Sequence, residues 1–439
     1  MRRSNHGPRL LVASLLFAAA VYTPRPAGAE VVRQLAGNVS LGSRVVVSGN
    51  GRFVLRHEPS GGDVCGTPRN GTVVDVVVYD LETSRGECVT VDPDGRGIFG
   101  PHDSASISAD GQLVVFSSNV DGLDPRCDHV LSPRHPGHVY LRNRLTRHTE
   151  CISVTEAGVP GNGTGAMISA NGGLIAFWTS DPNLIEGGFG LVVVKLVGGV
   201  RQGPAVLAIP REFRNGGVPA YTLSGDGRFV AFVASTLDAG AVVHAFRRNL
   251  ESGEVVPMDL SAAGELANTR MDYKIALSAD GRFGVFQSPA NNLIPGITAN
   301  PGPQLYRRDF ETGEVVLVSR GLAGLPANAY FPSTQPPLTI SADGRFVLFS
   351  SDATNLVAND TNGTTDLFVA DLSTGISRIT RLSVATDGVT EANGPSTSGG
   401  ASALMAGSPR STAMPPTWTL TVQGQDFFWP ASPRSSKPC

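Results

Sequence analysis

Short apolar runs alternate with polar, glycine-containing turns along most of this chain. One run, residues 345–350, reads Arg-Phe-Val-Leu-Phe-Ser and directly follows an Asp-Gly pair. Asp-Gly and Asn-Gly pairs can adopt the positive φ values that a two-residue hairpin turn requires. The apolar positions do not show the 3.6-residue periodicity of an amphipathic helix. The pattern therefore predicts many short antiparallel strands joined by tight turns.

This strand-turn-strand pattern is an internal repeat. Six segments approximate Ser-x-Asp/Asn-Gly-Arg-Phe-Val-x-Phe, at residues 48–56, 108–116, 169–177, 224–232, 278–286 and 341–349. Their turn glycines are separated by 60, 61, 55, 54 and 63 residues, and they are Gly51, Gly111, Gly172, Gly227, Gly281 and Gly344. A period of this length without helices predicts the blades of a β-propeller.

Each copy reads as four strands. In the sixth copy the strand at 345–350 is followed by strands at 366–371 and 379–382, with a turn at Ser373-Thr374-Gly375 before the last one. These residues resemble the TolB-type, WD40-like propeller repeat, which carries Ser-x-Asp-Gly-Arg and a later Asp-x-x-Thr-Gly turn. The resemblance covers residues 30–400 and implies an all-β propeller of four-stranded antiparallel blades. It implies almost nothing about activity, because propellers host many unrelated functions.

The first 29 residues are predicted to be a signal peptide. Arg2, Arg3 and Arg9 precede or flank an apolar run at 10–21, and Ala27-Gly28-Ala29 supplies small residues for cleavage near Ala29. We therefore expect a periplasmic or secreted protein without a transmembrane segment. The segment at 31–35 is expected to close the ring as the outer strand of a seventh blade, because an up-and-down ring leaves open edges unless its ends pair.

Residues 401–439 do not show the seventh repeat that the period predicts. Ala403 to Pro409 stand where a Ser-Ala-Asp-Gly-Arg-Phe core is expected. GC-rich codons for residues from Ala403 onward, read from the third base of each codon, can encode a seventh Ala-Asp-Gly-Arg-Phe repeat. We interpret this irregular tail as a frameshifted seventh repeat. The alternative is a genuine closing segment, since residues 417–422 have β-forming composition.

Four cysteines occupy similar positions in adjacent repeats. Cys65 and Cys88 lie in the first repeat, and Cys127 and Cys151 lie in the second. Export favours one local disulfide in each repeat, tying the middle loop to the fourth strand. A metal-binding or nucleophilic role for these cysteines is the alternative. The fifth, Cys439, falls in the irregular tail.

Two loops carry candidate metal ligands. Asp360, Asn362 and Asp366 place oxygen side chains around a glycine, as in part of a calcium loop, so calcium is a candidate cofactor. A hydrogen-bonded Asx turn before the third strand is the alternative interpretation. In the second repeat, a metal site could combine side chains of His129, His135, His138, Asp124 and Asp128. The alternative there is a solvated loop bounded by a disulfide.

Charge and motifs narrow the functional classes. The net charge of −3 supplies no basic field, so no nucleic-acid partner is expected. The turn aspartates recur once per repeat, which indicates a structural role, and no catalytic motif is evident. We expect a monomeric, non-catalytic binding scaffold for a protein, peptide or glycan. The alternatives are a propeller enzyme of the lyase or glycosidase type acting at the channel mouth, and a structural component of the cell envelope.

Overall fold

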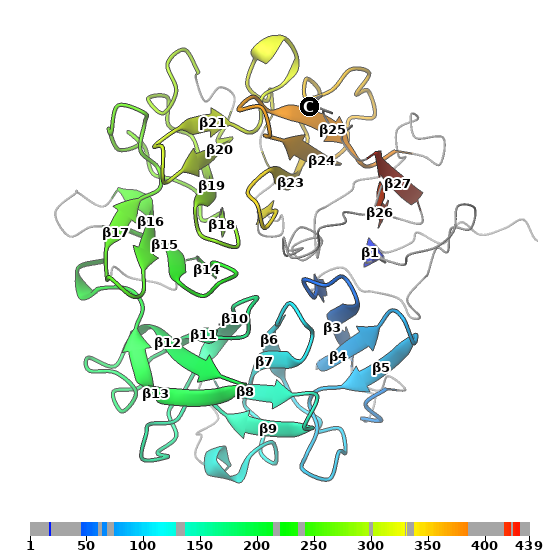
Figure 1. The fold of residues 1–439 in the computed structure, drawn as a ribbon, viewed down its shortest axis with the longest axis vertical. Helices are drawn as coiled ribbons and strands as arrows, with labels where there is room; N and C mark the ends of the chain where they lie inside the picture. The colour runs from blue at the N-terminus through cyan, green and yellow to red at the C-terminus, as the bar shows by residue number, and fades with distance from the viewer. Residues whose placement is uncertain are drawn as a thin grey trace, which may run out of the picture.

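Six four-stranded antiparallel sheets are arranged as the blades of a propeller, with the first strand of each blade nearest the centre (Figure 1). This computed structural model confirms the predicted β-propeller. It describes residues 17–18, 45–59, 64–67, 74–128, 137–213, 220–235, 242–297, 302–329, 331, 338–384, 417–422 and 425–430. No helix in these ranges is long and apolar enough to cross a membrane.

The blades follow chain order, and each contributes its four strands in sequence. Blade 1 comprises β2 (Val45–Val47), β3 (Phe53–Pro59), β4 (Val74–Asp80) and β5 (Arg85–Cys88). Blade 2 comprises β6 (His102–Ile107), β7 (Leu113–Ser118), β8 (His138–Asn143) and β9 (His148–Cys151), with the short 3-10 helix η1 (Pro125–Cys127) between β7 and β8. Blade 3 comprises β10 (Thr164–Ile168), β11 (Leu174–Thr179), β12 (Gly190–Val197) and β13 (Val200–Leu207).

The remaining blades have the same plan. Blade 4 follows η2 (Arg211–Phe213) and comprises β14 (Tyr221–Leu223), β15 (Phe229–Ser235), β16 (Val243–Asn249) and β17 (Val255–Pro257). Blade 5 comprises β18 (Ile275–Leu277), β19 (Phe283–Ser288), β20 (Gln304–Asp309) and β21 (Val315–Leu317). Blade 6 follows η3 (Leu322–Gly324) and comprises β22 (Thr339–Ile340), β23 (Phe346–Ser351), β24 (Asp366–Asp371) and β25 (Arg378–Arg381).

The repeated core forms the turn between the first two strands, held by one hydrogen-bond pattern in all six blades. In blade 5 Ser278 Oγ donates to Asp280 Oδ1 at 2.7 Å and accepts from Phe283 N at 2.9 Å. Asp280 Oδ1 also accepts from Arg282 N at 3.0 Å, and Gly281 takes a φ of 70°. The equivalent serines donate at 2.5 to 2.6 Å, and they are Ser48, Ser108, Ser169, Ser224 and Ser341. The structural role predicted for the turn aspartates is confirmed.

Neighbouring turns are joined to one another by backbone hydrogen bonds. The bonds run from blade 1 to blade 6 through Asn50 N to Ala109 O, Ala109 N to Ala170 O, Asn171 N to Gly225 O, Asp226 N to Ala279 O and Ala279 N to Ala342 O. The side chain after the turn in one blade also packs on the turn glycine of the next blade, and this side chain is a phenylalanine at Phe53, Phe229 and Phe283. A Cβ on Gly281 would lie 2.3 Å from the Phe229 ring, so only glycine fits this position. The turns therefore set the spacing of the blades.

Aromatic pairs on the second and third strands fill the space between blades. Four such pairs are stacked with ring centroids 5.6 to 5.8 Å apart, Phe116–Tyr140, Phe232–Phe246, Phe286–Tyr306 and Phe349–Phe368. Each pair joins residues of two successive blades in one apolar cluster. In blade 1 the equivalent positions on the second and third strands are Arg56 and Val77, so no aromatic pair forms there. Arg56 instead forms an ion pair with Glu58 and lies 5.0 Å from the ring centroid of Tyr79.

A seventh, smaller sheet consists of β1 (Phe17–Ala18), β26 (Thr417–Val422) and β27 (Gln425–Pro430). In Figure 1 these strands lie in the sector between blades 6 and 1. Strand formation at 417–422 agrees with its β-forming composition. The expected closing strand at 31–35 and the start of the tail at 401–416 lie outside the described residues. The frameshifted seventh repeat stays a prediction, and cleavage near Ala29 would remove β1 from the mature chain.

Substitution S278A tests the turn network. It removes a buried hydroxyl that satisfies both Asp280 and Phe283 N, so we expect the free energy of unfolding to fall by about 1–3 kcal/mol. Urea denaturation measures the change. S252A, at an exposed turn position, is the matched control and should change stability by less than about 0.5 kcal/mol. Equal effects of the two substitutions would argue against the network.

The coding DNA tests the origin of the tail. We expect a single-nucleotide insertion or deletion near codon 403 to restore a seventh Asp-Gly-Arg-Phe core. The frame-corrected protein should unfold at a higher temperature than this chain, because a seventh turn can extend the turn-to-turn hydrogen bonds. Gene sequencing and thermal denaturation of both chains provide the measurements. A gene in which no such change restores the repeat contradicts the interpretation.

Candidate functional site

Both predicted disulfides are present. Cys65 bonds to Cys88 at the end of β5, and Cys127 in η1 bonds to Cys151 at the end of β9. Each therefore connects the middle loop of its blade to the fourth strand. This confirms the pairing expected from the repeat positions, and Cys439 lies outside the described residues.

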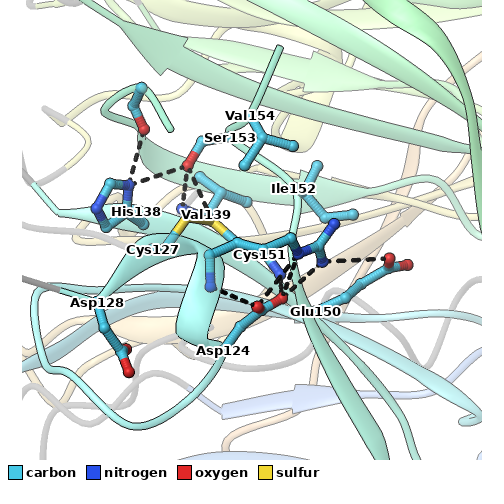
Figure 2. The surroundings of a disulfide bond; sticks show 12 residues. Asp124, Cys127, Asp128, His138, Val139, Glu150, Cys151, Ile152, Ser153 and Val154 are labelled. Atoms are coloured by element: carbon cyan, nitrogen blue, oxygen red, sulfur yellow. Dashed lines mark hydrogen bonds and ion pairs between the residues drawn. A yellow bond between two sulfur atoms is a disulfide. The ribbon is translucent and has the colours of Figure 1, made fainter. Parts of the chain in front are cut away.

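Asp124 anchors the blade 2 disulfide loop. Its Oδ1 accepts from Arg126 N at 2.9 Å and caps η1, while its Oδ2 accepts from Cys151 N at 2.7 Å. The Arg126 guanidinium lies 2.6 Å from Asp124 and 3.7 Å from Glu150. Burial alone would raise the pKa of Asp124, but the hydrogen bonds from Arg126 and Cys151 outweigh it, and the pKa lies below its usual value. In Figure 2 Asp124 and Glu150 lie on one side of the disulfide, and His138 and Ser153 on the other.

A cavity of about 510 Å³ opens beside this loop, between blades 1 and 2. We call it the blade 1–2 cavity. Its lining comes from the segment after β5, from η1 and its flanks, and from the β8–β9 hairpin. The lining residues are Asp92, Pro93, Leu123, Asp124, Pro125, Arg126, Arg142, Arg147, His148, Thr149 and Glu150. Charged side chains of both signs and few apolar ones therefore surround the space.

Arg142 is the most deeply placed cation of the cavity lining. It projects from β8 with 6% of its surface exposed, and its Nη1 donates to Arg147 O at 2.8 Å and Thr149 Oγ1 at 3.1 Å. Its Nε has no hydrogen-bond partner among the described residues. Burial lowers the pKa of Arg142, and burial raises the pKa of the nearby Glu150 carboxyl. The sequence pattern does not distinguish Arg142, because an arginine on a strand resembles any exposed polar position.

Of the five candidate metal ligands of blade 2, the described residues include Asp124, Asp128 and His138. His129 and His135 lie outside the described residues, and Asp128 accepts from Gly122 N at 2.8 Å. His138 begins β8, is 1% exposed and donates through Nδ1 to Gly161 O at 2.8 Å. One of its ring nitrogens lies within 4.8 Å of the sulfur atoms of Cys127 and Cys151. The structure thus brings His138 together with the disulfide, a combination that the sequence pattern did not predict.

The candidate calcium residues do come together, around an arginine. Asp366 is fully buried and accepts from Ser383 Oγ at 2.5 Å and Asn362 Nδ2 at 3.0 Å. Arg381 Nη1 lies 3.6 Å from both the Asp360 and Asp366 carboxylates. Asn362 Oδ1 accepts from Thr364 N at 3.0 Å, which is the predicted Asx turn. A guanidinium therefore supplies positive charge to both carboxylates, while calcium binding by Asp360, Asn362 and Asp366 stays a prediction.

No protein-family model and no curated protein sequence matches this chain. Solved structures do match it. TolB from Acinetobacter baumannii is 13% identical, with a TM-score of 0.40 over 76% of this chain and 65% of that chain. Hydrazine synthase from Kuenenia stuttgartiensis is 12% identical, with a TM-score of 0.40 over 77% of this chain and 80% of that one. The β-propeller domain of Cps50 (Swd1) from Myceliophteria thermophila is 13% identical, with a TM-score of 0.42 over 90% of this chain and 100% of that one.

The structural neighbours include TolB and WD40 β-propeller domains. This chain spans 65% of the length of the Acinetobacter TolB chain. At these identities the likeness concerns the fold alone, and the chemistry has to be argued from the site.

His102 on β6 makes stability at the blade 1–2 boundary depend on pH. Burial lowers the pKa of His102 from 6.5 to about 4, and its Nε2 donates to Ile98 O at 3.1 Å. The unfolded chain takes up this proton as the pH falls through about 6.5, whereas the folded chain resists until about 4. We therefore expect stability to be lost between pH 6.5 and 4, and H102Q to flatten that part of the profile. Urea denaturation at pH 4.5 and 7.5 measures the free energy of unfolding. If H102Q loses as much of this free energy between the two pH values as the wild-type chain does, the expectation is contradicted.

Proposed function

We propose that this protein is an exported, non-catalytic binding propeller that holds an acidic peptide segment in the blade 1–2 cavity. The observation that supports this most directly is Arg142, a buried guanidinium that lines an open cavity and uses only part of its donor capacity. Two disulfides fit an oxidising compartment, the periplasm or the exterior. Binding functions commonly reside in the loops of a rigid scaffold, and the segment after β5 and the flanks of η1 contribute lining residues to this cavity.

A carboxylate is the group that suits Arg142. A guanidinium has five N–H donors in a planar fork that matches a carboxylate, and the charge-assisted pair is stronger than a neutral hydrogen bond. Arg147 is exposed on the same hairpin and adds positive charge at the cavity. Arg126 adds less positive charge to the cavity, because it already forms ion pairs with Asp124 and Glu150.

The rest of the lining suits a peptide chain. Glu150, Asp92 and Thr149 offer oxygen atoms that can accept peptide N–H groups. Among the described lining residues there is no phenylalanine, tyrosine or tryptophan to cover a sugar ring. An extended segment with a free carboxylate therefore matches the cavity better than a neutral glycan does. The volume of about 510 Å³ lies in the range of ordinary ligand pockets.

Substitution R142Q tests this assignment. We expect at least about a tenfold loss of affinity for a fluorescent library of Asp- and Glu-containing peptides, measured by anisotropy, because a charge-assisted bond contributes about 1.5–3 kcal/mol. R228Q is the matched control, since Arg228 lies in a turn of blade 4 and pairs with Asp226. Amidated, glutamine-substituted peptides should bind the wild-type chain weakly.

Two outcomes would overturn the proposal. One is equal peptide affinity in the wild-type chain, R142Q and R228Q. The other is selective binding of a uronate oligosaccharide, with no peptide bound, which would assign the cavity to a glycan.

A further inference from the structure

We propose that Cys127, Cys151 and His138 form a zinc site when their disulfide is reduced. In the oxidised protein the two cysteines are bonded to each other. In the reduced protein two thiolates and one imidazole would converge on a single position. This inference is independent of the peptide-binding proposal, because His138 does not line the blade 1–2 cavity.

The donor atoms are already close enough. The two sulfur atoms and a ring nitrogen of His138 lie within 4.8 Å of one another. Zinc binds sulfur at about 2.3 Å and imidazole nitrogen at about 2.1 Å, so its tetrahedral ligands are spaced by roughly 3.5–4 Å. Separating two bonded sulfur atoms to that spacing requires a movement of roughly 2 Å. Side-chain rotation can supply much of it.

The surrounding contacts hold these three residues in place without the disulfide. Gly161 O accepts from His138 Nδ1 and orients the imidazole ring. Ser153 Oγ lies 3.7 Å from Cys151 Sγ and 3.5 Å from His138 Nδ1 (Figure 2). Asp124 joins the η1 loop to the backbone of Cys151. Cys127 therefore stays near Cys151 after reduction.

The chemistry balances with a dithiol as reductant. A dithiol thiolate attacks one cysteine sulfur, and the second dithiol thiol then closes its own disulfide, leaving two cysteine thiols. Zn²⁺ displaces the two thiol protons and binds both thiolates and the neutral imidazole. Two negative thiolates and one Zn²⁺ sum to zero net charge. That neutrality suits a site in which all three residues are no more than 2% exposed.

Three protein ligands leave the fourth zinc position for water or an exogenous group, as in zinc sites that bind ligands. The blade 1 disulfide provides the comparison within the same chain. Cys65 and Cys88 occupy equivalent repeat positions, and Cys88 Sγ lies 3.8 Å from Thr90. Among the described residues, no third histidine, cysteine or carboxylate ligand joins that pair. Only the blade 2 disulfide is expected to yield a zinc site.

The experiment uses the full chain, reduced with a dithiol, freed of reductant under argon and titrated with Zn²⁺ against a chromophoric chelator. We expect one zinc per reduced chain and none per oxidised chain. The double variant C65A/C88A should retain that zinc, and C127A/C151A should lose it. H138Q should bind zinc at least tenfold more weakly. Co²⁺ in place of zinc should give the thiolate charge-transfer absorption of a tetrahedral site in the reduced wild-type chain.

The proposal fails if reduced wild type and C127A/C151A bind zinc equally, or if H138Q matches wild type. It also fails if the reduced wild-type chain loses its far-ultraviolet circular dichroism, since no folded site then exists. A reduced wild-type chain that shows no cobalt–thiolate charge-transfer band would also overturn the proposal, and this test needs no substitution.

Discussion

The turn built by serine, Asp or Asn, and glycine is the interaction on which this propeller depends. Its serine hydroxyl is buried near the axis, where an unsatisfied polar group would cost about 1–3 kcal/mol. The hydroxyl therefore donates to the carboxylate or amide oxygen and accepts from the backbone, and both partners lie within five residues. Because each turn also bonds to the next, a local motif becomes the inner ring of the fold.

The outer strands are joined by a second set of contacts, made by long side chains. Arg201 of blade 3 donates to Ile152 O and Val154 O of blade 2. Arg248 and Arg308 reach the carbonyls of their preceding blades in the same way. The blades are thus fixed at the centre and at the periphery. The middle loops lie between these constraints and are free to differ, as the blade 2 loop does.

The start of the third strand carries a buried polar pair in several blades. His244 Nδ1 lies 2.8 Å from Asp259, Ser319 donates to Gln304, and Ser383 donates to Asp366. His138 with Ser153 is the blade 2 member of this series. In blades 4, 5 and 6 the polar residue at the start of the third strand forms a buried hydrogen-bonded pair. In blade 2 the residue at this position, His138, also lies beside a disulfide. The proposed zinc site arises from that coincidence of a repeated polar position with a local cross-link.

The amino-acid sequence by itself determined the blade architecture, the hairpin turns, the disulfide pairing and the Asx turn at Asn362, because each depends on residues close together in one repeat. Tertiary structure alone placed Arg381 between Asp360 and Asp366, which precede it by 21 and 15 residues, and it set His138 beside Cys127 and Cys151. It also enclosed Arg142 in a cavity shared by two blades. Hydrogen-bonded turns are short-range and recur in register, so a pattern reveals them. Burial and convergence depend on how blades pack, and a linear pattern does not contain that information.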